Sequence, residues 1–553
     1  MYVRTTKRQN KNGSLTEYLQ LAHNEWDRET HRSTVKVLLN LGRKEDVDAL
    51  GLERLVASLQ RYLGSLPGFK PNDSVSDVSV LASRVHGVCW LLEGLWQRLQ
   101  IGDCLKRMLS KTEYEIPIER SIFAMVANRA TNPVSKLSTE HWVNFEACIP
   151  GLQSVFVHQL YRSMDFILEH DVALQENVFF SVANLLNLEV DLIYFDTTSI
   201  YFDIDEPDDT DDGVDCSLRQ YGHSKDHRPD LPQVVIGMAV TKEGIPVRCW
   251  VFSGETSDMS MVEQVKKDLN GWKLGRVVFV MDCGFSSDEN CIKLQTGGGH
   301  FIIGEKMRSG KPEVEAALSK RGRFTMIKEG LYAKEAIIGD GERRKRFAVV
   351  LNEKVATKDR LTREKHLTSL EEKLSQTKAM DKKEHTKAIC KLVSHPVYGR
   401  YLKKRGDGAL EIDKQKIVAE EKLDGKYLIK TSDDTLSLND IVLGYKQLHD
   451  IERGFRSLKT ELELRPVYHR KSDRIRSHVL ICWLALLLIR TVENETGMTW
   501  FQVKKILKSI NLVSLKLPEG VVQQSTVLTD KQESIYRACR VKLPPKVIQV
   551  KPA

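Results

Sequence analysis

The chain has 553 residues, of which 41% are hydrophobic and 29% are charged, and its formal net charge is +8 at pH 7. This length exceeds what one hydrophobic core organises, and the apolar share excludes a chain that is disordered throughout, so we expect about three domains. The positive charge suits an anionic partner such as nucleic acid without proving one.

The ten cysteines are scattered along the chain, without a Cys-x-x-Cys pair or a spacing typical of zinc sites, which indicates free thiols in a reducing compartment. The N-terminus MYVRTTKRQNKNGS lacks the apolar stretch of a secretory signal. The longest apolar run, Val479 to Ile489, is about half the roughly 20 residues of a membrane span. We therefore expect a buried helix there, a cytoplasmic, nucleoid-associated protein, and no membrane partner.

The first half of the chain divides into two predicted regions. Residues 1–112 form an N-terminal region, a candidate for binding DNA ends, in which an alternating pattern up to about residue 45 predicts a hairpin. Helical spacing of apolar residues from 48 onward predicts helices. Residues 113–188 are predicted to be helical as well, most clearly in LYRSMDFILEHDVALQENVFFSVANLL.

The pattern changes at about residue 190. Five short, β-rich apolar segments follow, namely DLIYFDTT, LPQVVIGMAV, GIPVRCWVFSG, GRVVFVMD and GHFIIGE. Asp258 is a candidate cap for a helix through MSMVEQVKKDL, and SSDENCIKLQ predicts another helix. Residues 189–304 are therefore expected to form an α/β sheet, the first part of a core.

The remainder divides into three predicted segments. Residues 305–436 are predicted to be a separate α+β insertion, because the strand-like KRFAVVLN and GKYLIKTS flank a long, highly charged stretch. Residues 437–497 contain two strong helical patterns, at about 437–461 and 473–496, and form the second part of the core. Residues 498–553 are predicted to be a C-terminal tail.

Two aspartates follow apolar strands. Asp196 follows the predicted strand Asp191–Phe195, and Asp282 follows Val277–Met281. A carboxylate at the carboxyl end of a strand in an open α/β sheet points into the crevice where ligands bind. An aspartate there often only begins a turn or caps a helix, and for Asp282 that alternative has equal weight. Two such strand ends favour divalent-metal phosphoryl chemistry, which needs converging oxygen ligands.

A third carboxylate is available on the predicted helix 437–461. Tyr445, Glu452 and Lys459 are seven residues apart, nearly two helical turns, and therefore lie on one stripe. An exposed face with paired charges is the commoner use of such spacing. The apolar neighbours Ile451 and Phe455 argue that this helix is not freely solvated.

Several motifs together resemble those of a known family. FDTTS at 195–199, DCGF at 282–285 and the Tyr445/Glu452/Lys459 spacing resemble the three motifs of the DDE transposases of bacterial insertion sequences. More narrowly, they resemble the insertion-sequence-four group, whose signature is Tyr-x-x-Arg-x-x-x-Glu-x-x-x-x-x-x-Lys. Segments 128–142, 221–233 and 252–258 are similar to that family as well.

One position departs from this signature. Leu448 stands where the signature has arginine. Four neighbouring residues could substitute for that arginine, and the sequence does not choose among them: Lys446, His449, Arg453 and Arg456.

The resemblance implies a fold and a chemistry. The fold is α/β, a ribonuclease-H-like catalytic core interrupted by an α+β insertion, with a mostly helical N-terminal region. The activity is DNA transposition, in which two Mg²⁺ ions, or Mn²⁺ in their place, are held by Asp196, Asp282 and Glu452, with Asp196 bridging both ions. Water is the first nucleophile, and the freed 3′-OH then attacks target DNA.

The partners implied are double-stranded DNA, both terminal inverted repeats and target, and a second copy of the chain in a homodimer. The residues expected to contact DNA are Tyr445, Lys459, Arg456, Arg453, His449, His223 and Lys225. The insertion helix and segment 465–476 could follow the DNA backbone. A catalytically inactive DNA-binding relative and a nuclease without strand transfer are the alternative functions.

Two further features are interpreted as having no metal role. The acidic stretch 203–215 lacks the ligand spacing of a calcium loop and is expected to be a solvated loop. His223 and His227 lie in a polar segment, where a contact to DNA is a better interpretation than a zinc site.

Overall fold

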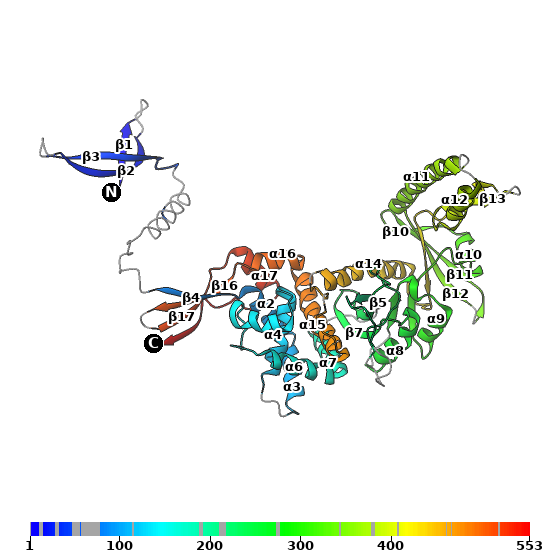
Figure 1. Cartoon of the computed structure of the whole chain (residues 1–553), viewed down its shortest axis with the longest axis horizontal. Coiled ribbons are helices and arrows are strands. Elements are labelled where there is room, and N and C mark those ends of the chain that lie inside the picture. Colours follow the sequence, from blue (N-terminus) through cyan, green and yellow to red (C-terminus); the bar gives the residue numbers. More distant parts are fainter. Residues whose placement is uncertain are drawn as a thin grey trace. The chain divides into compact units, whose positions relative to one another are not determined.

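The computed structural model describes residues 2–9, 15–27, 32–46, 56, 78–112, 116–186, 192–208, 217–272, 277–341, 344–377, 382–405, 409–460, 462–465, 467–517 and 520–552. The chain divides into two compact units, and Figure 1 labels the helices and strands along the chain. The first comprises residues 1–82, 514–523 and 549–553, and the second comprises 83–513 and 524–548.

The N-terminal residues form an antiparallel sheet of three strands, β1 (Tyr2–Gln9), β2 (Leu15–Asp27) and β3 (Arg32–Arg43). The predicted hairpin is thus confirmed and gains a third strand. The helices predicted from residue 48 lie largely outside the described residues. Residues 79–85 were predicted to be helical but form the strand β4 (Ser79–Val85). The reason is a long-range pairing, because β4 joins a sheet whose order is β18-β17-β16-β4. Its partners come from the chain's end: β16 (Asn511–Leu517), β17 (Gly520–Ser525) and β18 (Val547–Pro552).

The second unit is built on a nine-stranded mixed sheet with the order β10-β11-β12-β15-β9-β8-β5-β6-β7. Its strands are β5 (Leu192–Tyr201), β6 (Gln233–Val240), β7 (Pro246–Ser253), β8 (Val278–Met281), β9 (His300–Glu305), β10 (Thr325–Lys328), β11 (Leu331–Ile338), β12 (Lys345–Asn352) and β15 (Lys426–Thr431). β5, β8 and β9 run parallel, and the other neighbours pair antiparallel. The five strands predicted between 190 and 305 are therefore confirmed, within a mixed α/β architecture.

Some helices pack on the two faces of this sheet, and others pack mainly on one another. The N-terminal helices are α2 (Gly87–Arg98), α3 (Ile101–Leu109), α4 (Ile118–Thr131), α5 (Lys136–His141), α6 (Val157–Glu169) and α7 (Asp171–Leu186). Those that follow are α8 (Asp258–Asn270), α9 (Asp288–Gln295), α10 (Pro312–Ser319), α14 (Leu438–Thr460), α15 (Ser472–Thr496), α16 (Trp500–Leu507) and α17 (Asp530–Ala538). The helical prediction for 113–188 is confirmed where the chain is described. Helix α8 begins after Ser257, which occupies the N-cap, so the prediction that Asp258 is the cap was wrong by one position.

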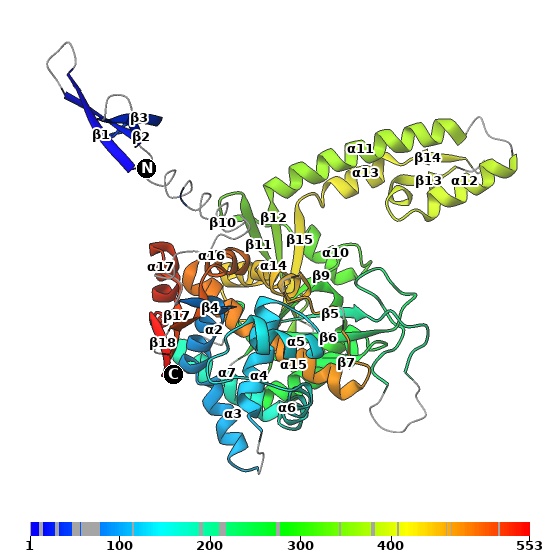
Figure 2. The ribbon, with the colours of Figure 1, turned by 60° about the vertical axis from the view of Figure 1, so that its left-hand side comes forward.

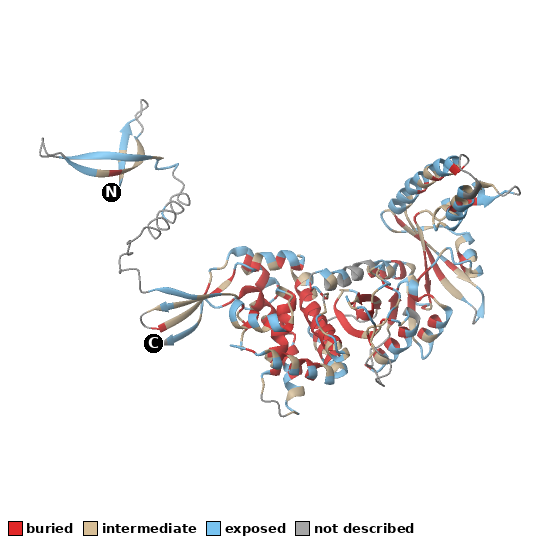
Figure 3. Ribbon diagram, in the orientation of Figure 1, coloured by how far each residue is buried: buried red, intermediate tan, exposed pale blue. Residues whose placement is uncertain are grey.

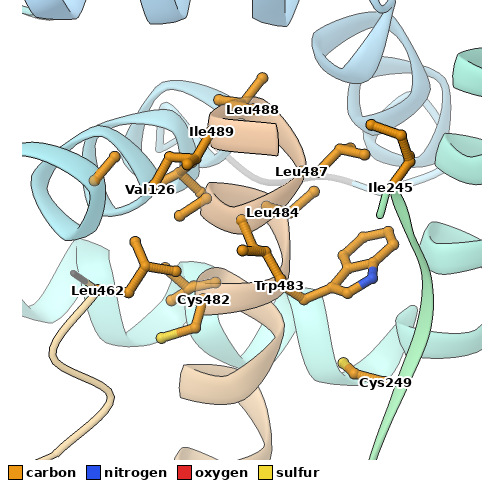
Figure 4. Close-up of a cluster of buried hydrophobic side chains, with 14 of the residues drawn as sticks. Val126, Ile245, Cys249, Leu462, Cys482, Trp483, Leu484, Leu487, Leu488 and Ile489 are labelled. Carbon is orange, nitrogen blue, oxygen red and sulfur yellow. The ribbon is translucent and has the colours of Figure 1, made fainter. Parts of the chain in front are cut away.

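Helix α15 is the centre of the helical core. Apolar residues surround its axis, a pattern typical of a fully buried helix, and side chains from Ile475 to Val492 are almost all buried. Trp483, Leu484 and Leu487 pack between α4 and β7 (Figure 4). By length and composition this helix could cross a membrane, but 89% of its most apolar window is buried inside the protein, as in the core helix of a soluble protein.

The stretch predicted to be a separate insertion has two parts. Its strands β10, β11, β12 and β15 continue the core sheet instead of forming one of their own, because β15 pairs directly with β9. The helical part projects from the sheet between β12 and β15 (Figure 2) and has a small core of its own around Leu370 and Tyr401. It contains α11 (Glu353–Thr377), α12 (Lys382–Ser394), α13 (Lys414–Glu421) and a two-stranded ribbon, β13 (Leu402–Lys404) with β14 (Leu410–Ile412). Helix α11 is largely exposed (Figure 3).

Candidate active site

Asp196 and Asp282 occupy neighbouring positions on adjacent strands. The parallel pairing of β5 with β8 runs from Leu192 opposite Val278 to Phe195 opposite Met281, and each aspartate directly follows one residue of this last pair. The prediction that Asp196 ends its strand was wrong. β5 continues to Tyr201, because the β-branched run after Asp196 pairs antiparallel with β6. The parallel pairing with β8 is what ends here, at Phe195, directly before Asp196.

Both aspartates face the same side of the sheet. Ile193 and Phe195 pack into the core that also contains residues of α8 and α9, whereas Tyr194 packs into the core on the opposite face. Because side chains alternate along a strand, Asp196 shares the face of Tyr194. The same alternation in β8 and the extended backbone of Asp282 place that carboxylate on this face too.

Asp282 also caps a turn. Its carboxylate accepts a hydrogen bond of 2.5 Å from the backbone N–H of Cys283, at the start of a 3₁₀ turn over Cys283–Phe285. The turn interpretation of Asp282 is therefore correct as far as it goes. Asp282 is nevertheless exposed, so its carboxylate remains accessible to a ligand.

Asp196 is more enclosed, with a side chain that is 18% exposed. Its Oδ1 accepts hydrogen bonds from the N–H of Thr197 at 2.7 Å and from Lys225 Nζ at 3.4 Å. Burial raises the pKa of Asp196 above its usual range, and the negative charge of Asp282 acts in the same direction. Lys225 opposes this shift. A further cation beside the two carboxylates would be stabilised electrostatically.

Helix α14 packs on the face that carries these aspartates. The Tyr194 hydroxyl pairs with Gln447 Oε1, and Tyr445 lies so close to Gly304 of β9 that a Cβ there would meet its hydroxyl. The Tyr445 ring also stacks on Tyr427, with 6.0 Å between ring centroids. The site residue Tyr445 is thus half-buried against the sheet.

The structure describes the side chains of only some of the other predicted residues on α14. Leu448, at the signature's arginine position, is buried in the core. Arg456 is exposed. The backbone of α14 includes Glu452, but the side chains of three predicted site residues lie outside the described residues: His449, Glu452 and Arg453.

The segment 217–233 folds over the carboxyl end of β5. Within it, Lys225 reaches Asp196, and His223 is exposed. The next residue, Asp226, forms ion pairs with Lys459 Nζ at 2.9 Å and with Arg465 at 3.1 Å. The structure therefore brings Lys459 to the loop that carries Lys225.

Asp226 was not among the predicted site residues, and Arg465 was predicted only as the first residue of segment 465–476, which could follow the DNA backbone. Their signal in the sequence is weak, because an ion pair between residues more than 200 positions apart leaves no local pattern. The opposite charges of adjacent Lys225 and Asp226 were the one available hint. The acidic stretch 203–215 lies partly outside the described residues, and Asp208 within it binds Arg219.

The donor set fits a hard divalent cation in part. Asp196 and Asp282 supply carboxylate oxygens on one face, which Mg²⁺ and Mn²⁺ prefer. Among the described residues, no three His, Cys, Asp or Glu side chains form a metal-binding group, and the side chain of Glu452 lies outside them.

Comparisons with known proteins place the chain in a class. Residues 217–488 match the family model described as the transposase DDE domain. This range contains Asp282 and Glu452 and begins after Asp196. The chain is therefore a DDE transposase.

The N-terminal region narrows this assignment. Residues 3–71 match the model described as the N-terminal domain of IS1634 family transposases, so the chain carries the N-terminal domain of that family. A comparison with curated proteins gave no match. Among solved structures, the chain is similar to a piggyBac transposase in a synaptic complex with hairpin DNA, at 11% identity and a TM-score of 0.33. This match covers 76% of this chain and 78% of that chain.

Proposed function

We propose that this DDE transposase cleaves DNA at the ends of its element and joins the freed 3′-OH to target DNA. Asp196, Asp282 and Glu452 are the proposed ligands of two divalent cations. The proposal rests chiefly on one observation, the adjacent positions of Asp196 and Asp282 where the β5–β8 pairing ends. The carboxyl end of parallel strands is where ligands bind in open α/β sheets.

The metal requirement follows from the carboxylates and from the class. Two Mg²⁺ or Mn²⁺ ions would activate the attacking oxygen and stabilise the leaving oxygen at the scissile phosphodiester. Asp196 is the proposed bridging ligand, and its partial burial excludes bulk water on one side. Asp282 keeps its exposed carboxylate in place through the hydrogen bond from Cys283.

Support for Glu452 comes from the backbone of α14. Position 452 shares a helical stripe with Tyr445 and Leu448, both of which pack toward the sheet. Hydrogen bonds also hold the helix on either side of position 452, between Gln447 and Tyr194 and between Lys459 and Asp226. These anchors favour a position near Asp196.

Seven residues remain proposed DNA contacts: Tyr445, Lys459, Arg456, Arg453, His449, His223 and Lys225. Among those described, His223 and Arg456 are exposed and therefore open to a phosphate. The Lys225 side chain is 35% exposed, and its Nζ already donates to Thr197 and Asp196. Lys459 is 19% exposed and sits beside Arg465, which favours a contact to the backbone next to the scissile phosphate.

The finer assignments are proposals as well. The strand order β7-β6-β5-β8-β9, with three antiparallel strands followed by two parallel ones, supports a ribonuclease-H-like core. The Tyr445/Glu452/Lys459 spacing supports the insertion-sequence-four signature. We also propose action as a homodimer on paired double-stranded DNA ends, in the cytoplasm at the nucleoid.

Purified protein, Mn²⁺ and DNA from the flanks of the gene test this proposal. We expect cleavage and strand transfer by the wild type, loss of both in Asp282→Asn, and normal rates in the control Asp340→Asn, an exposed aspartate between β11 and β12. Equal cleavage by Asp282→Asn would refute the metal site. Cleavage without strand transfer would identify a nuclease, and no cleavage by any variant would indicate an inactive DNA-binding relative.

A further inference from the structure

Lys225 and Asp226 are adjacent, oppositely charged residues that contact different elements. Lys225 Nζ lies 3.4 Å from Asp196 Oδ1 on β5. Asp226 pairs with Lys459, near the end of α14, and with Arg465, just beyond it. We infer that the two residues form a charged clasp that fixes the end of α14, and that Asp226 is a positioning residue for the reaction.

The clasp is held in place by its own backbone. Ser224 is buried, and its hydroxyl accepts a hydrogen bond of 3.3 Å from the N–H of Asp226. The N–H of Lys225 donates to Ser199 Oγ on β5 at 2.9 Å. His227 adopts a left-handed conformation with φ of 58°, which turns the chain sharply after Asp226. Backbone hydrogen bonds, and not only the ion pairs, therefore hold Lys225 and Asp226 in position.

Burial distinguishes these ion pairs from an ordinary surface pair. The side chains of Asp226 and Lys459 are 18% and 19% exposed, whereas those of Arg228 and Asp230, which follow Asp226 in the same loop, are 42% and 60% exposed. Water and salt screen the second pair far more strongly. Arg465 is further restrained by the Tyr201 ring, whose centroid lies 4.6 Å from its guanidinium carbon.

The consequence concerns the helix that carries Glu452, and here the inference rests on the proposed function. Tyr194 on β5 forms a hydrogen bond with Gln447 of α14, and Asp226 forms one with Lys459, beyond position 452. Without Asp226, only the hydrogen bond at Gln447 remains of these two. A misplacement of about 1 Å at a reacting centre costs roughly 100-fold in rate. Asp226 would thus act through α14 without touching metal or DNA.

The full-length protein with the substitution Asp226→Asn tests this role, with Asp230→Asn as the matched control. DNA affinity and the single-turnover cleavage rate at saturating protein are measured separately on DNA from the element's end. Removing a negative charge beside two cations should leave affinity unchanged or tighter. The cleavage rate of Asp226→Asn should fall about 10- to 100-fold, and that of Asp230→Asn should stay within about twofold of wild type.

Rescue separates positioning from damage to the fold. Asp226→Glu restores a carboxylate and should return the rate to within about threefold of wild type. Equal rates for the 226 and 230 asparagine variants would overturn the inference, as would failure of rescue or a parallel loss of affinity and rate. Those results require an active wild type, so they leave the proposed function intact. A wild type that does not cleave refutes the proposed function, and the inference with it.

Discussion

Gly254 allows a quantitative test of how the position of segment 217–233, which carries Lys225 and Asp226, is fixed. Its backbone approaches two carbonyl groups at the base of segment 217–233, where Gln220 and Gln233 form a bridge. A Cβ on Gly254 would lie 2.1 Å from the oxygen of Gln233 and 2.2 Å from that of Gln220. Its N–H also donates to the carbonyl of Leu218 at 3.0 Å.

The substitution Gly254→Ala converts these distances into an expected cost. Ordinary contact begins at 3.4 Å, so backbone atoms on one side must move by more than 1 Å. Because the obstacle is backbone and not the end of a flexible side chain, we expect a loss of about 2–4 kcal/mol in unfolding free energy. The same shift carries Lys225 and Asp226 away from their partners, so cleavage should fall about 100-fold.

Thermal unfolding and cleavage of Gly254→Ala are compared with those of Gly271→Ala. Gly271 follows α8 with φ of −59°, and a Cβ there meets nothing closer than 3.4 Å. This control should be neutral or stabilised by about 0.4–1 kcal/mol. The reasoning is refuted if the two variants unfold at the same temperature and cleave at the same rate.

Three further outcomes are expected. Burial beside Arg129 lowers the pKa of Lys136 to about 7. The unfolded chain keeps this lysine protonated up to about pH 10.4, so the destabilisation is complete below pH 7 and falls away as the pH rises from 7 to about 10.4. Lys136→Met should therefore raise the free energy of unfolding by about 4 kcal/mol at pH 7 and by under about 1 kcal/mol at pH 10, measured by unfolding at both pH values. Trp483→Ala should cost about 3–5 kcal/mol, because Trp483 is fully buried, whereas Trp26→Ala, at a residue 61% exposed, should change the unfolding midpoint little. Mn²⁺ should raise the unfolding temperature of the wild type but not of Asp282→Asn, and chelation should abolish cleavage as well as this shift.

Local sequence predicted the strands of the core well. The strands after residue 190 consist of β-branched, apolar runs, and β6 is buried along its whole length, so composition and structure agree. The prediction for Asp196 failed at the strand's end for a related reason. An acidic residue interrupts the apolar run of β5, and only the pairing with β6 shows that the strand continues.

Long-range contacts account for the rest. Nothing near Lys426 indicates that β15 pairs with β9 and joins the insertion's strands to the core sheet. The clasp was equally hidden, since Asp226 meets Lys459 only after the whole insertion has folded back. The neighbouring positions of Asp196 and Asp282, by contrast, could be expected, because the apolar runs that precede them were predicted to lie in one sheet.

The place where the helical part of the insertion joins the sheet has a consequence for how such a chain can change length. Strands β12 and β15 are direct neighbours, with Leu351 opposite Lys426. At the end of this pairing, the N–H of Asn352 donates to the carbonyl of Gly425 at 2.8 Å. If residues 353–424 were removed, Asn352 and Gly425 would therefore be close enough for a tight hairpin to connect them. A whole module can be gained, lost or exchanged at this seam without shifting the register of any strand, so the length of chain between Asp282 and Glu452 is free to vary while the core sheet keeps its register.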